Sequence, residues 1–372
     1  MMKKMLVIGD GNSVFVKDFI HQYSKQGVII DLISLGKAEK NQAVKVQKNF
    51  QFKSGFGLSS IKNFFNFRNS IIEQMDNDYD VVVIHFIYFF LAPHIFKLKN
   101  KTKKIVSVVW GSDYYRVNSG LKIFLQDIIY KNSHSIVFTN PKTKEVFAQT
   151  KKHIHTQLEV ARFGLPVLDE IEQLKEHNYI ELCNDFNLPN NKIKIMVGYN
   201  ANLAHEQLLI IDQVSNFNEN LLDKIHLIFL LGYGSSESKL LIEQALTKNK
   251  HINYTILEEF YDFHEVAKLR LITDILINIQ PTDQFSGSMQ ETLYAGGWIL
   301  TGAWLPYEML MKLEPKIILM KDKNEVGKKL TLLIENNAKS SLENTEEVKG
   351  YIKTESSWEN NISIWNKIVF SD

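Results

Sequence analysis

The sequence predicts an α/β protein with two domains, each built on a doubly wound parallel sheet. Short apolar runs alternate with segments of helical period from one end of the chain to the other, which is typical of parallel sheets covered on both faces. The 372 residues suffice for two domains of about 150 residues each. A polar, acidic stretch interrupts the pattern, so we expect a first domain at 1–168, a linker at 169–190, a second domain at 191–350 and a C-terminal segment at 351–372.

In the first domain the apolar runs predict six strands, and most of these runs end at or near a Gly, an Asn or a charged residue. These strands are expected at 5–9, 28–34, 80–85, 104–110, 135–139 and 158–162. The intervals between them can hold the crossover helices that parallel strands require.

The same alternation restarts after the polar stretch and predicts six more strands. They are expected at 192–198, 224–232, 251–257, 274–279, 298–301 and 316–320. Near the C-terminus, Trp358, Ile362, Trp365 and Ile368 recur at spacings of three and four. This spacing predicts a last helix that packs by one face against the body.

Composition excludes several classes of protein. Lys and Arg number 43 against 42 Asp and Glu, a net charge of +1, so electrostatically driven binding of nucleic acid is not expected. The single cysteine, Cys183, excludes an internal disulfide and a multi-cysteine zinc site, in agreement with a reducing compartment. The longest apolar stretch, 81–96, is shorter than the ~18 residues of a membrane-spanning helix. We therefore expect a cytoplasmic protein.

One segment of the second domain carries both an anion-binding feature and two carboxylates. Ser286, Gly287 and Ser288 open a predicted helix, where backbone N–H groups and the helix dipole favour an anion. Asp283 lies on the preceding loop and Glu291 about one turn into the helix. Glu291 is suited to accept from ribose hydroxyls and Asp283 from a sugar. The alternative is a plain helix start with a solvated Glu.

This segment resembles the acidic-x7-acidic signature of glycosyltransferases with the GT-B fold, in the form Asp283-x7-Glu291. Retaining members carry Glu at the first position, where this chain has Asp283. The resemblance implies two Rossmann-like domains facing each other across a cleft, with a nucleotide-sugar donor on the second domain and an acceptor on the first. It implies no cofactor, only a UDP-, GDP- or TDP-sugar as donor substrate.

The loop at 197–205 lies where such enzymes hold the donor diphosphate, and its usual Arg and Lys are absent. In that respect it resembles the bacterial transferases of 4-acetamido-4,6-dideoxygalactose in enterobacterial common antigen synthesis. The resemblance implies that the donor contacts of this domain include Gly198, Asn200, Asn202, His205, Gly232, Tyr233, Glu258 and Phe260. For His205 an exposed helix-start histidine is the alternative, and for Glu258 and Phe260 ordinary loop packing.

In the first domain, polar and small residues follow predicted strands. The expected acceptor contacts are Gly11, Asn12, Trp110, Gly111 and Ser112. His85, Asp113 and Asp10 are candidates for the base that deprotonates an acceptor hydroxyl in an inverting reaction. A structural role, such as hydrogen bonding a loop, is the alternative for each.

The sequence offers weaker signals for a metal and for a membrane. Asp76-Asn77-Asp78 matches an Asp-x-Asp metal motif but precedes a strand, away from the expected cleft, so no obligatory metal is predicted. Aromatic and basic residues interleave at 50–72, and five lysines lie within 97–104. Both segments suit contact with anionic lipid, and a buried aromatic helix beside a solvated loop is the alternative.

The leading hypothesis is a metal-independent glycosyltransferase of bacterial surface polysaccharide synthesis, with a glycan or lipid-linked acceptor. It would contact the inner face of the plasma membrane peripherally. Whether the reaction retains or inverts the anomeric configuration stays open. A catalytically silent subunit of the same shape is a second hypothesis, motivated by the missing Arg and Lys. The turn Gly9-x-Gly11 motivates a third, a nicotinamide-dependent enzyme, although Val14 occupies the position of the third glycine in that fingerprint.

Overall fold

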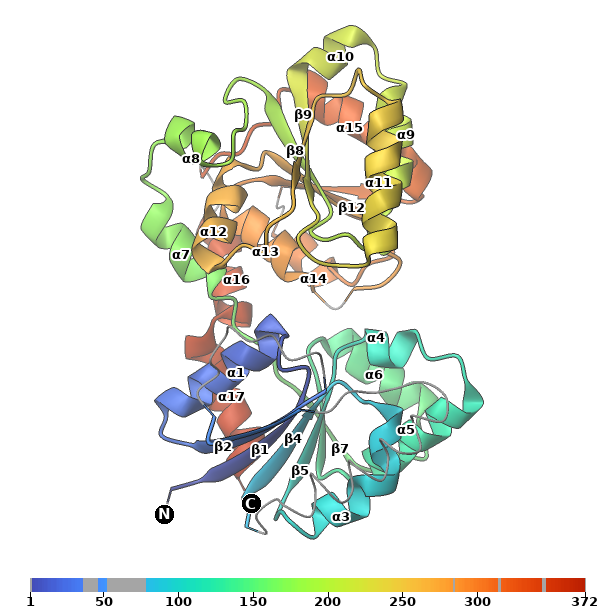
Figure 1. Cartoon of the computed structure of the whole chain (residues 1–372), viewed down its shortest axis with the longest axis vertical. Helices are drawn as coiled ribbons and strands as arrows, with labels where there is room; N and C mark the ends of the chain where they lie inside the picture. The colour runs from blue at the N-terminus through green and yellow to red at the C-terminus, as the bar shows by residue number, and fades with distance from the viewer. Residues whose placement is uncertain are drawn as a thin grey trace. The chain divides into compact units, whose positions relative to one another are not determined.

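The chain forms two compact units, each around one parallel sheet (Figure 1). The computed structural model describes residues 2–35, 46–51, 78–283, 285–313, 316–342 and 346–371. The first unit consists of 1–164 together with 358–372, and the second of 165–357. The predicted α/β class with two parallel sheets is confirmed.

The first sheet has seven strands in the order β3-β2-β1-β4-β5-β6-β7, all parallel. The elements of this unit are β1 (Lys4–Gly9), α1 (Val14–Lys25), β2 (Ile29–Ser34), β3 (Lys48–Gln51), β4 (Val81–His85), η2 (Phe89–His94), α3 (Ile95–Lys99), β5 (Ile105–Val109), α4 (Ser112–Tyr115), α5 (Gly120–Asn132), β6 (Ser135–Phe138), α6 (Pro141–Thr150), β7 (Gln157–Val160) and α17 (Trp358–Phe370).

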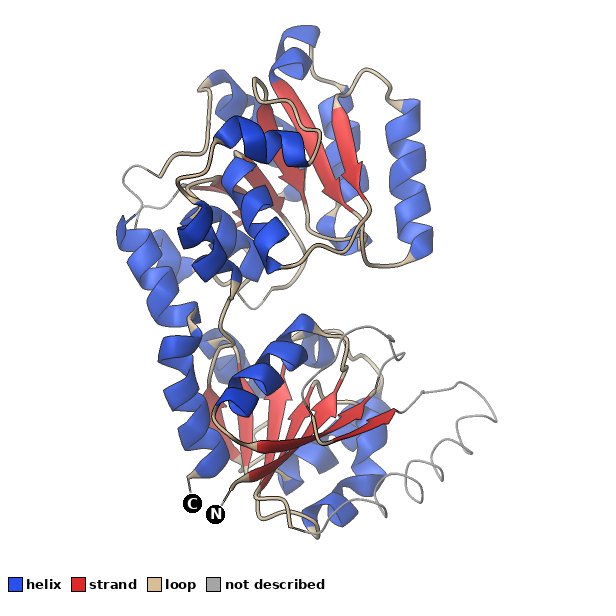
Figure 2. Ribbon diagram, turned by 60° about the vertical axis from the view of Figure 1, so that its left-hand side comes forward, coloured by secondary structure: helices blue, strands red, loops and turns tan. Residues whose placement is uncertain are grey.

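Helices cover both faces of this sheet, which explains why its central strands are apolar throughout rather than alternating. On one face α1 and the C-terminal helix α17 pack on the strands, with Trp365 fully buried. On the other face the strands meet η2, α3, α5 and α6. Figure 2 shows helices on both faces of the sheet. The apolar positions at spacings of three and four in α17 therefore belong to the core of the first unit.

The second sheet has six parallel strands in the order β10-β9-β8-β11-β12-β13. The elements of this unit are α7 (Val167–Leu174), α8 (Tyr179–Asp185), β8 (Ile193–Val197), η3 (Leu203–His205), α9 (Gln207–Ser215), α10 (Glu219–Lys224), β9 (Ile225–Leu230), α11 (Ser236–Lys248), β10 (Tyr254–Leu257), α12 (Phe263–Ile272), β11 (Ile275–Asn278), α13 (Gly287–Tyr294), β12 (Trp298–Gly302), α14 (Glu308–Met311), β13 (Ile317–Met320), η4 (Lys323–Glu325), α15 (Val326–Glu335) and α16 (Glu346–Ser356).

Residues 169–190, expected to be a linker, are instead part of the second unit. This stretch forms most of α7 and all of α8, which both pack against α12 within the second unit. Its acidic residues lie on the outer face, while Leu168, Ile171 and Leu174 are buried in the core. The polar composition therefore reflects an amphipathic helix on the surface of a domain.

Each sheet reverses its strand order once, between β1 and β4 in the first unit and between β8 and β11 in the second. In open α/β sheets the loops at the carboxyl ends of the two strands beside such a point diverge and leave room for a ligand. The loops after β1 and β4, and those after β8 and β11, are therefore the places where a site is expected.

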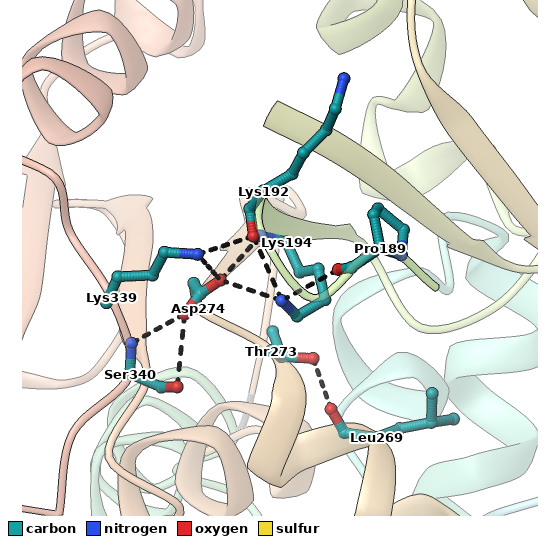
Figure 3. Close-up of polar contacts among 8 residues, drawn as sticks. All are labelled: Pro189, Lys192, Lys194, Leu269, Thr273, Asp274, Lys339 and Ser340. Atoms are coloured by element: carbon teal, nitrogen blue, oxygen red, sulfur yellow. Dashed lines mark hydrogen bonds and ion pairs between the residues drawn. The ribbon is translucent and has the colours of Figure 1, made fainter. Parts of the chain in front are cut away.

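The opposite, amino end of the second sheet is fastened by a buried ion pair (Figure 3). The Asp274 Oδ2 accepts from the Lys194 amide at 2.8 Å and lies 3.6 Å from the Lys194 Nζ. The Lys339 Nζ lies 3.5 Å from the same oxygen, and the Ser340 amide donates to Oδ1 at 2.9 Å. Burial lowers the pKa of Lys194, and the Asp274 charge opposes that shift. This cluster joins β8, β11 and the loop after α15.

The amino end of the first sheet has a similar carboxylate, but its lysine partner is exposed. Asp80 precedes β4 as Asp274 precedes β11, and its Oδ2 accepts from the Lys4 amide of β1 at 2.9 Å. Its other oxygen pairs with the Lys103 Nζ at 2.8 Å, but the Lys103 side chain is 79% exposed. The two units thus share a backbone arrangement and differ in how far its carboxylate is buried.

Candidate functional site

The loop after β8 is built around a close contact between Gly198 and His205. Gly198 has φ +69°, a conformation that favours glycine, and a Cβ added to it would lie 2.8 Å from the His205 Cβ. The His205 ring packs against Tyr199 with centroids 4.2 Å apart, and His205 is only 2% exposed. His205, expected to face a phosphate, is therefore packed inside the loop and shapes the turn.

The two asparagines of this loop have different roles. The Asn202 Oδ1 accepts from the Ala204 amide at 3.0 Å and caps η3. The backbone oxygen of Asn200 accepts from the Gln207 Nε2 at 2.8 Å, whereas its Oδ1 is buried without a hydrogen-bond partner in the described part of the chain. Because a buried polar atom without a partner is costly, Asn200 is the residue of this loop that a bound ligand would satisfy.

Glycines bring the loops after β9 and β10 against the loop after β8. The Ala201 amide donates to the Tyr233 carbonyl at 2.8 Å, and a Cβ on Gly234, whose φ is +125°, would lie 2.7 Å from the Ala201 oxygen. A Cβ on Gly232 would lie 2.0 Å from the Glu259 oxygen. Larger residues at these two glycines would force the three loops apart.

Two aromatic side chains stay exposed on these loops. Tyr233 is 51% and Phe260 55% exposed, and their ring centroids are 6.1 Å apart. Close by in sequence, the Glu258 carboxylate pairs with the Lys239 Nζ at 3.0 Å. Exposed rings give flat surfaces on which a nucleobase can stack.

Asp283 is held at the carboxyl end of β11 by several donors. Its Oδ2 accepts from the Tyr307 hydroxyl, from the Ser286 amide at 3.1 Å and from the Asn278 Nδ2 at 3.4 Å. Burial raises the pKa of Tyr307 well above its usual value, and the Asp283 charge adds to the shift. The Tyr307 hydroxyl therefore stays protonated and keeps donating to the Asp283 carboxylate.

The start of α13 presents backbone donors. Phe285 just before it has φ +145°, a strained value for a residue with a bulky side chain. The Ser286 Oγ accepts from the Met289 amide at 3.4 Å and caps the helix. The amides of Gly287 and Ser288 have no acceptor among the described residues. They and the helix dipole make this end of α13 suitable for an anion.

A buried arginine that no sequence motif indicated holds Glu291. Arg270, on α12 and 3% exposed, donates from Nε to the Glu291 Oε2 at 3.0 Å and from Nη2 to the Ser288 Oγ at 2.9 Å. The other Glu291 oxygen lies 3.6 Å from where a Gly287 Cβ would stand, so it faces the helix start. Arg270 thereby fixes both the carboxylate and the first turn of α13.

The charges of Arg270 and Glu291 also affect the pKa of Tyr233. Burial raises the pKa of Tyr233, although half of the residue is exposed; the Arg270 charge opposes the shift and the Glu291 charge adds to it. Tyr233 therefore lies close enough to Arg270 and Glu291 to interact with them electrostatically. The aromatic pair, Glu291 and the helix start belong to one edge of the second sheet.

In the first unit the turn after β1 is tight. The Asp10 Oδ1 accepts from the Asn12 amide at 3.0 Å, and the Gly11 amide donates to the Ser34 Oγ at 3.1 Å. A Cβ on Gly11 would lie 2.5 Å from that oxygen. The glycine is thus required by the packing of β1 on β2, whether or not a ligand binds there.

Asp113 joins the loops after β4 and β5. Its Oδ2 accepts from the Ile87 amide at 2.8 Å and its Oδ1 from the Trp110 amide at 2.9 Å, and the residue is 1% exposed. Burial raises its pKa to about 6, and these backbone hydrogen bonds oppose the shift. Gly111, with φ +95°, turns the chain into α4 at Ser112. These contacts favour the structural role of Asp113 over that of a base.

His85 lies inside an aromatic cage. It is fully buried, and its ring centroid lies 4.7 Å from that of Phe19, 5.7 Å from Phe163 and 6.1 Å from Trp110. Neither ring nitrogen has a hydrogen-bond partner in the described part of the chain. Burial lowers the pKa of His85 to about 3, so its ring is neutral at physiological pH. This environment does not support the expected role as a base.

The structure thus gathers the expected donor residues on the loops at the carboxyl edge of the second sheet, and the expected acceptor residues at that edge of the first. Arg270, Asn278 and Tyr307 are contacts that sequence reasoning missed. Asp76, Asn77 and most of 50–72 lie outside the described residues, whereas Asp78 is exposed 3.5 Å from the Lys4 Nζ.

Residues 4–140 match the family model described as glycosyl transferase 4-like. No curated protein is a significant match in sequence to the chain.

Solved structures resemble the whole chain at low identity. Sucrose-phosphate synthase from Thermosynechococcus elongatus has a TM-score of 0.74 at 11% identity, over 98% of both chains. A UDP-forming α,α-trehalose-phosphate synthase from Burkholderia xenovorans, in complex with glucose-6-phosphate, has 0.70 at 9%, also over 98% of both. A structure described as trehalose-6-phosphate from E. coli bound with UDP-2-fluoro glucose has 0.71 at 11%, over 98% of this chain and 99% of that one. The chain therefore has the GT-B fold of these glycosyltransferase structures.

Proposed function

We propose that this protein is a glycosyltransferase that binds a nucleotide-diphosphate sugar on its second unit and transfers the sugar to an acceptor bound by the first. The observation that carries the proposal is the grouping of two exposed aromatic rings, a fixed carboxylate and an open helix N-terminus at one edge of the second sheet. The family match at 4–140 and the fold agree with it.

Each part of a nucleotide diphosphate has a partner of suitable chemistry there. The base stacks on Tyr233 and Phe260, and the ribose hydroxyls donate to the Glu291 oxygen that faces the helix start. The diphosphate accepts from the amides of Gly287 and Ser288. Transfer places negative charge on the departing diphosphate, and preorganised amides stabilise that charge as it develops.

Asp283 is proposed to contact the transferred sugar. The donors that hold its Oδ2 fix the orientation of the carboxylate, so it can accept from sugar hydroxyls with little loss of conformational freedom. Asp283→Asn should reduce turnover more than nucleotide affinity. A larger effect on affinity would reassign Asp283 to the nucleotide.

The acceptor is proposed to be a glycan or a lipid-linked saccharide of bacterial surface polysaccharide synthesis. The asparagine-rich loop at 197–205, which resembles that of acetamidofucose transferases, supports this class. It would place the enzyme in the cytoplasm, peripherally on the inner face of the plasma membrane. Among the described residues no helix is long and apolar enough to cross a membrane.

The reaction is proposed to need no metal. The role that a divalent cation plays beside a diphosphate would be taken by the α13 amides and its dipole. Activity should therefore persist in excess EDTA. Loss of activity that Mg²⁺ or Mn²⁺ restores would contradict this part of the proposal.

Calorimetry with UDP, GDP and TDP tests the donor site. One of them should bind the wild-type protein, and Phe260→Ala should weaken that binding about tenfold by removing one stacking surface. Phe96→Ala, an exposed aromatic of the first unit, is the control and should bind as the wild type does. Proton NMR of the product anomer then decides between retention and inversion.

A catalytically silent subunit remains the second candidate, and one observation favours it. The loop at 198–206 contains no Lys or Arg, and the buried Arg270 is neutralised by Glu291. If no nucleoside diphosphate binds in the calorimeter, this candidate replaces the first.

A further inference from the structure

The loop after β12 presents a tryptophan at the carboxyl edge of the second sheet. Trp304 lies two residues beyond the end of the strand and is 39% exposed. Its indole Nε1 donates to the backbone oxygen of Gln280 at 2.9 Å, and this hydrogen bond fixes the orientation of the ring. Single exposed apolar residues are common on protein surfaces, so the role of Trp304 depends on what surrounds it.

Gly302, the last residue of β12, allows the indole to lie directly against the strand. A Cβ added to Gly302 would lie 2.3 Å from both Cε2 and Cζ2 of the Trp304 ring, so any other residue there would collide with it. Part of the indole is therefore packed on backbone, and the rest is open to solvent. A ring that is already held in one position loses little side-chain entropy when a ligand stacks on it.

Buried hydrogen bonds connect the support of this ring to Asp283. The Gln280 Nε2 donates to the Asn278 Oδ1 at 3.3 Å, and the Asn278 Nδ2 donates to the Tyr307 hydroxyl at 2.8 Å and to the Asp283 Oδ2 at 3.4 Å. Asn278 is fully buried and Gln280 nearly so. Because β11 and β12 are paired neighbours, their loops lie side by side. The Trp304 ring and the Asp283 carboxylate are thus fixed to one scaffold.

The strand order arranges three kinds of group along this edge. Tyr233 and Phe260 lie on the loops after β9 and β10, α13 begins after β11, and Trp304 follows β12. Strands β9 and β12 are three positions apart, which is about 14 Å at the usual spacing of strands. The order of aromatic pair, helix start and Trp304 is the order of base, diphosphate and sugar in a nucleotide sugar. Trp304 therefore lies at the sugar end.

The segment around Trp304 brings no cation to this end of the edge. Between 280 and 311 the sequence holds no Lys or Arg, and its acidic residues are Asp283, Glu291 and Glu308. A carboxylate accepts from sugar hydroxyls, and the negative face of an indole attracts the C–H bonds of a pyranose ring. A uronate or a phosphorylated sugar would instead meet a charge of its own sign.

We infer that the Trp304 indole stacks on the transferred sugar, and that this sugar is a neutral pyranose. The inference rests on the proposed donor site and adds to it the residue that selects the sugar. Asp283 accepts from hydroxyls at the rim of the sugar ring, and the indole contacts its C–H face. Selection follows because a sugar whose face carries a charged or axial polar substituent does not lie flat on the indole.

Calorimetry of Trp304→Ala tests the inference. The probes are UDP, GDP and TDP, and the glucose, galactose, mannose and glucuronate conjugates of whichever nucleotide binds. Trp304→Ala should bind the free nucleotide as the wild type does, and should bind at least one neutral conjugate about tenfold more weakly, through loss of one stacking contact. Trp304→Phe keeps a ring and should recover most of that affinity.

Two further variants serve as controls. Phe260→Ala should weaken binding of the free nucleotide and of the conjugate equally, because it acts on the base. Met309→Ala removes an exposed apolar side chain from α14 and should weaken neither. Unchanged binding of the free nucleotide also shows that Trp304→Ala is folded.

Several outcomes would overturn the inference. They are equal losses of free nucleotide and conjugate in Trp304→Ala, no loss of any neutral conjugate, and tighter binding of the glucuronate conjugate than of the neutral ones by the wild type. If no nucleotide binds the wild type, the proposed function fails and the inference falls with it. If a nucleotide binds and Trp304→Ala has no selective effect, the inference alone fails.

Discussion

One buried ion pair determines how the second sheet presents a carboxylate to a ligand. The Glu291 side chain is 9% exposed and pairs with Arg270, whose guanidinium also holds the first turn of α13. A carboxylate oriented in this way loses little freedom on binding a ribose, so its contribution to affinity is larger than that of a solvated glutamate. The same burial makes the pair sensitive to substitution of either member.

We expect Glu291→Met and Arg270→Met each to lower the free energy of unfolding by about 3 kcal/mol, because each leaves an unpaired buried charge. The double variant should recover most of that stability but bind nucleotide as poorly as Glu291→Met. Urea unfolding and calorimetry measure the two effects. If the double variant were as unstable as the sum of the single ones, the pair would not be coupled in the folded protein.

His85 predicts a dependence of stability on pH. The unfolded chain protonates this histidine below about pH 6.5, whereas the folded protein keeps it neutral down to about pH 3 because it is buried. The unfolded state therefore binds more protons in this window, and stability falls as pH falls through it. His85→Leu, which removes the titrating ring, should flatten this part of the profile.

The measurement is urea unfolding of the wild type and His85→Leu at pH 7 and pH 5. At pH 7 the variant should be about as stable as the wild type, since it removes two buried nitrogens without partners. The exposed His155 gives the matched control variant, His155→Leu. Complete loss of turnover in His85→Leu with unchanged stability would support the base role instead.

At the scale of elements, the strands of both sheets could be predicted from the sequence. Their apolar runs are long enough to recognise, and Gly or polar residues lie near their ends. All twelve expected strands occur within a few residues of their predicted bounds. The edge strand β3 was not predicted, because its sequence, Lys-Asn-Phe-Gln, has neither an apolar run nor alternation. α7 and α8 were taken for a linker because local composition does not show which neighbours bury a short helix.

The fastenings at the amino ends of the sheets give a matched pair of variants. Asp274→Asn should destabilise the protein by about 3 kcal/mol, because Lys194 would stay buried without its counter-charge. Asp80→Asn removes the corresponding carboxylate from the first sheet and should cost less than about 1 kcal/mol, because its lysine partner is exposed. Thermal or urea unfolding compares the two; equal losses would show that burial is not the cause.

At the scale of the molecule, the predicted donor residues lie on four loops that one sheet brings to a common edge. Sequence motifs indicated Asp283, Glu291 and the glycines, since these sit at recognisable turns. Arg270 was not predicted, because it lies within a helix that carries no recognisable motif and reaches Glu291 only through the packing of α12 on α13. The use of Asn202 as a cap and the burial of His205 likewise depend on tertiary contacts.

Because the proposed donor site belongs to the second unit alone, a nucleotide should stabilise that unit selectively. Differential scanning calorimetry with the nucleoside diphosphate that binds, at about one hundred times its dissociation constant, should add about 2.7 kcal/mol to the stability of one transition. Adenosine, which lacks the diphosphate, is the control. Asp80→Asn identifies the unfolding transition of the first unit, and Asp274→Asn that of the second. If the ligand shifted the transition that Asp80→Asn moves, the ligand would be assigned to the first unit.

The return of α17 to the first sheet makes the second unit an insertion within the first. A protease that cuts once near Gly164 leaves the second unit attached to α17, and only the packing of that helix on the first sheet then holds the two fragments together. A truncated gene ending at codon 164 would encode a sheet missing Trp365 from one of its faces, and its product should aggregate. Residues 165–357, by contrast, form an uninterrupted stretch that can be excised whole for isotope labelling and ligand titration.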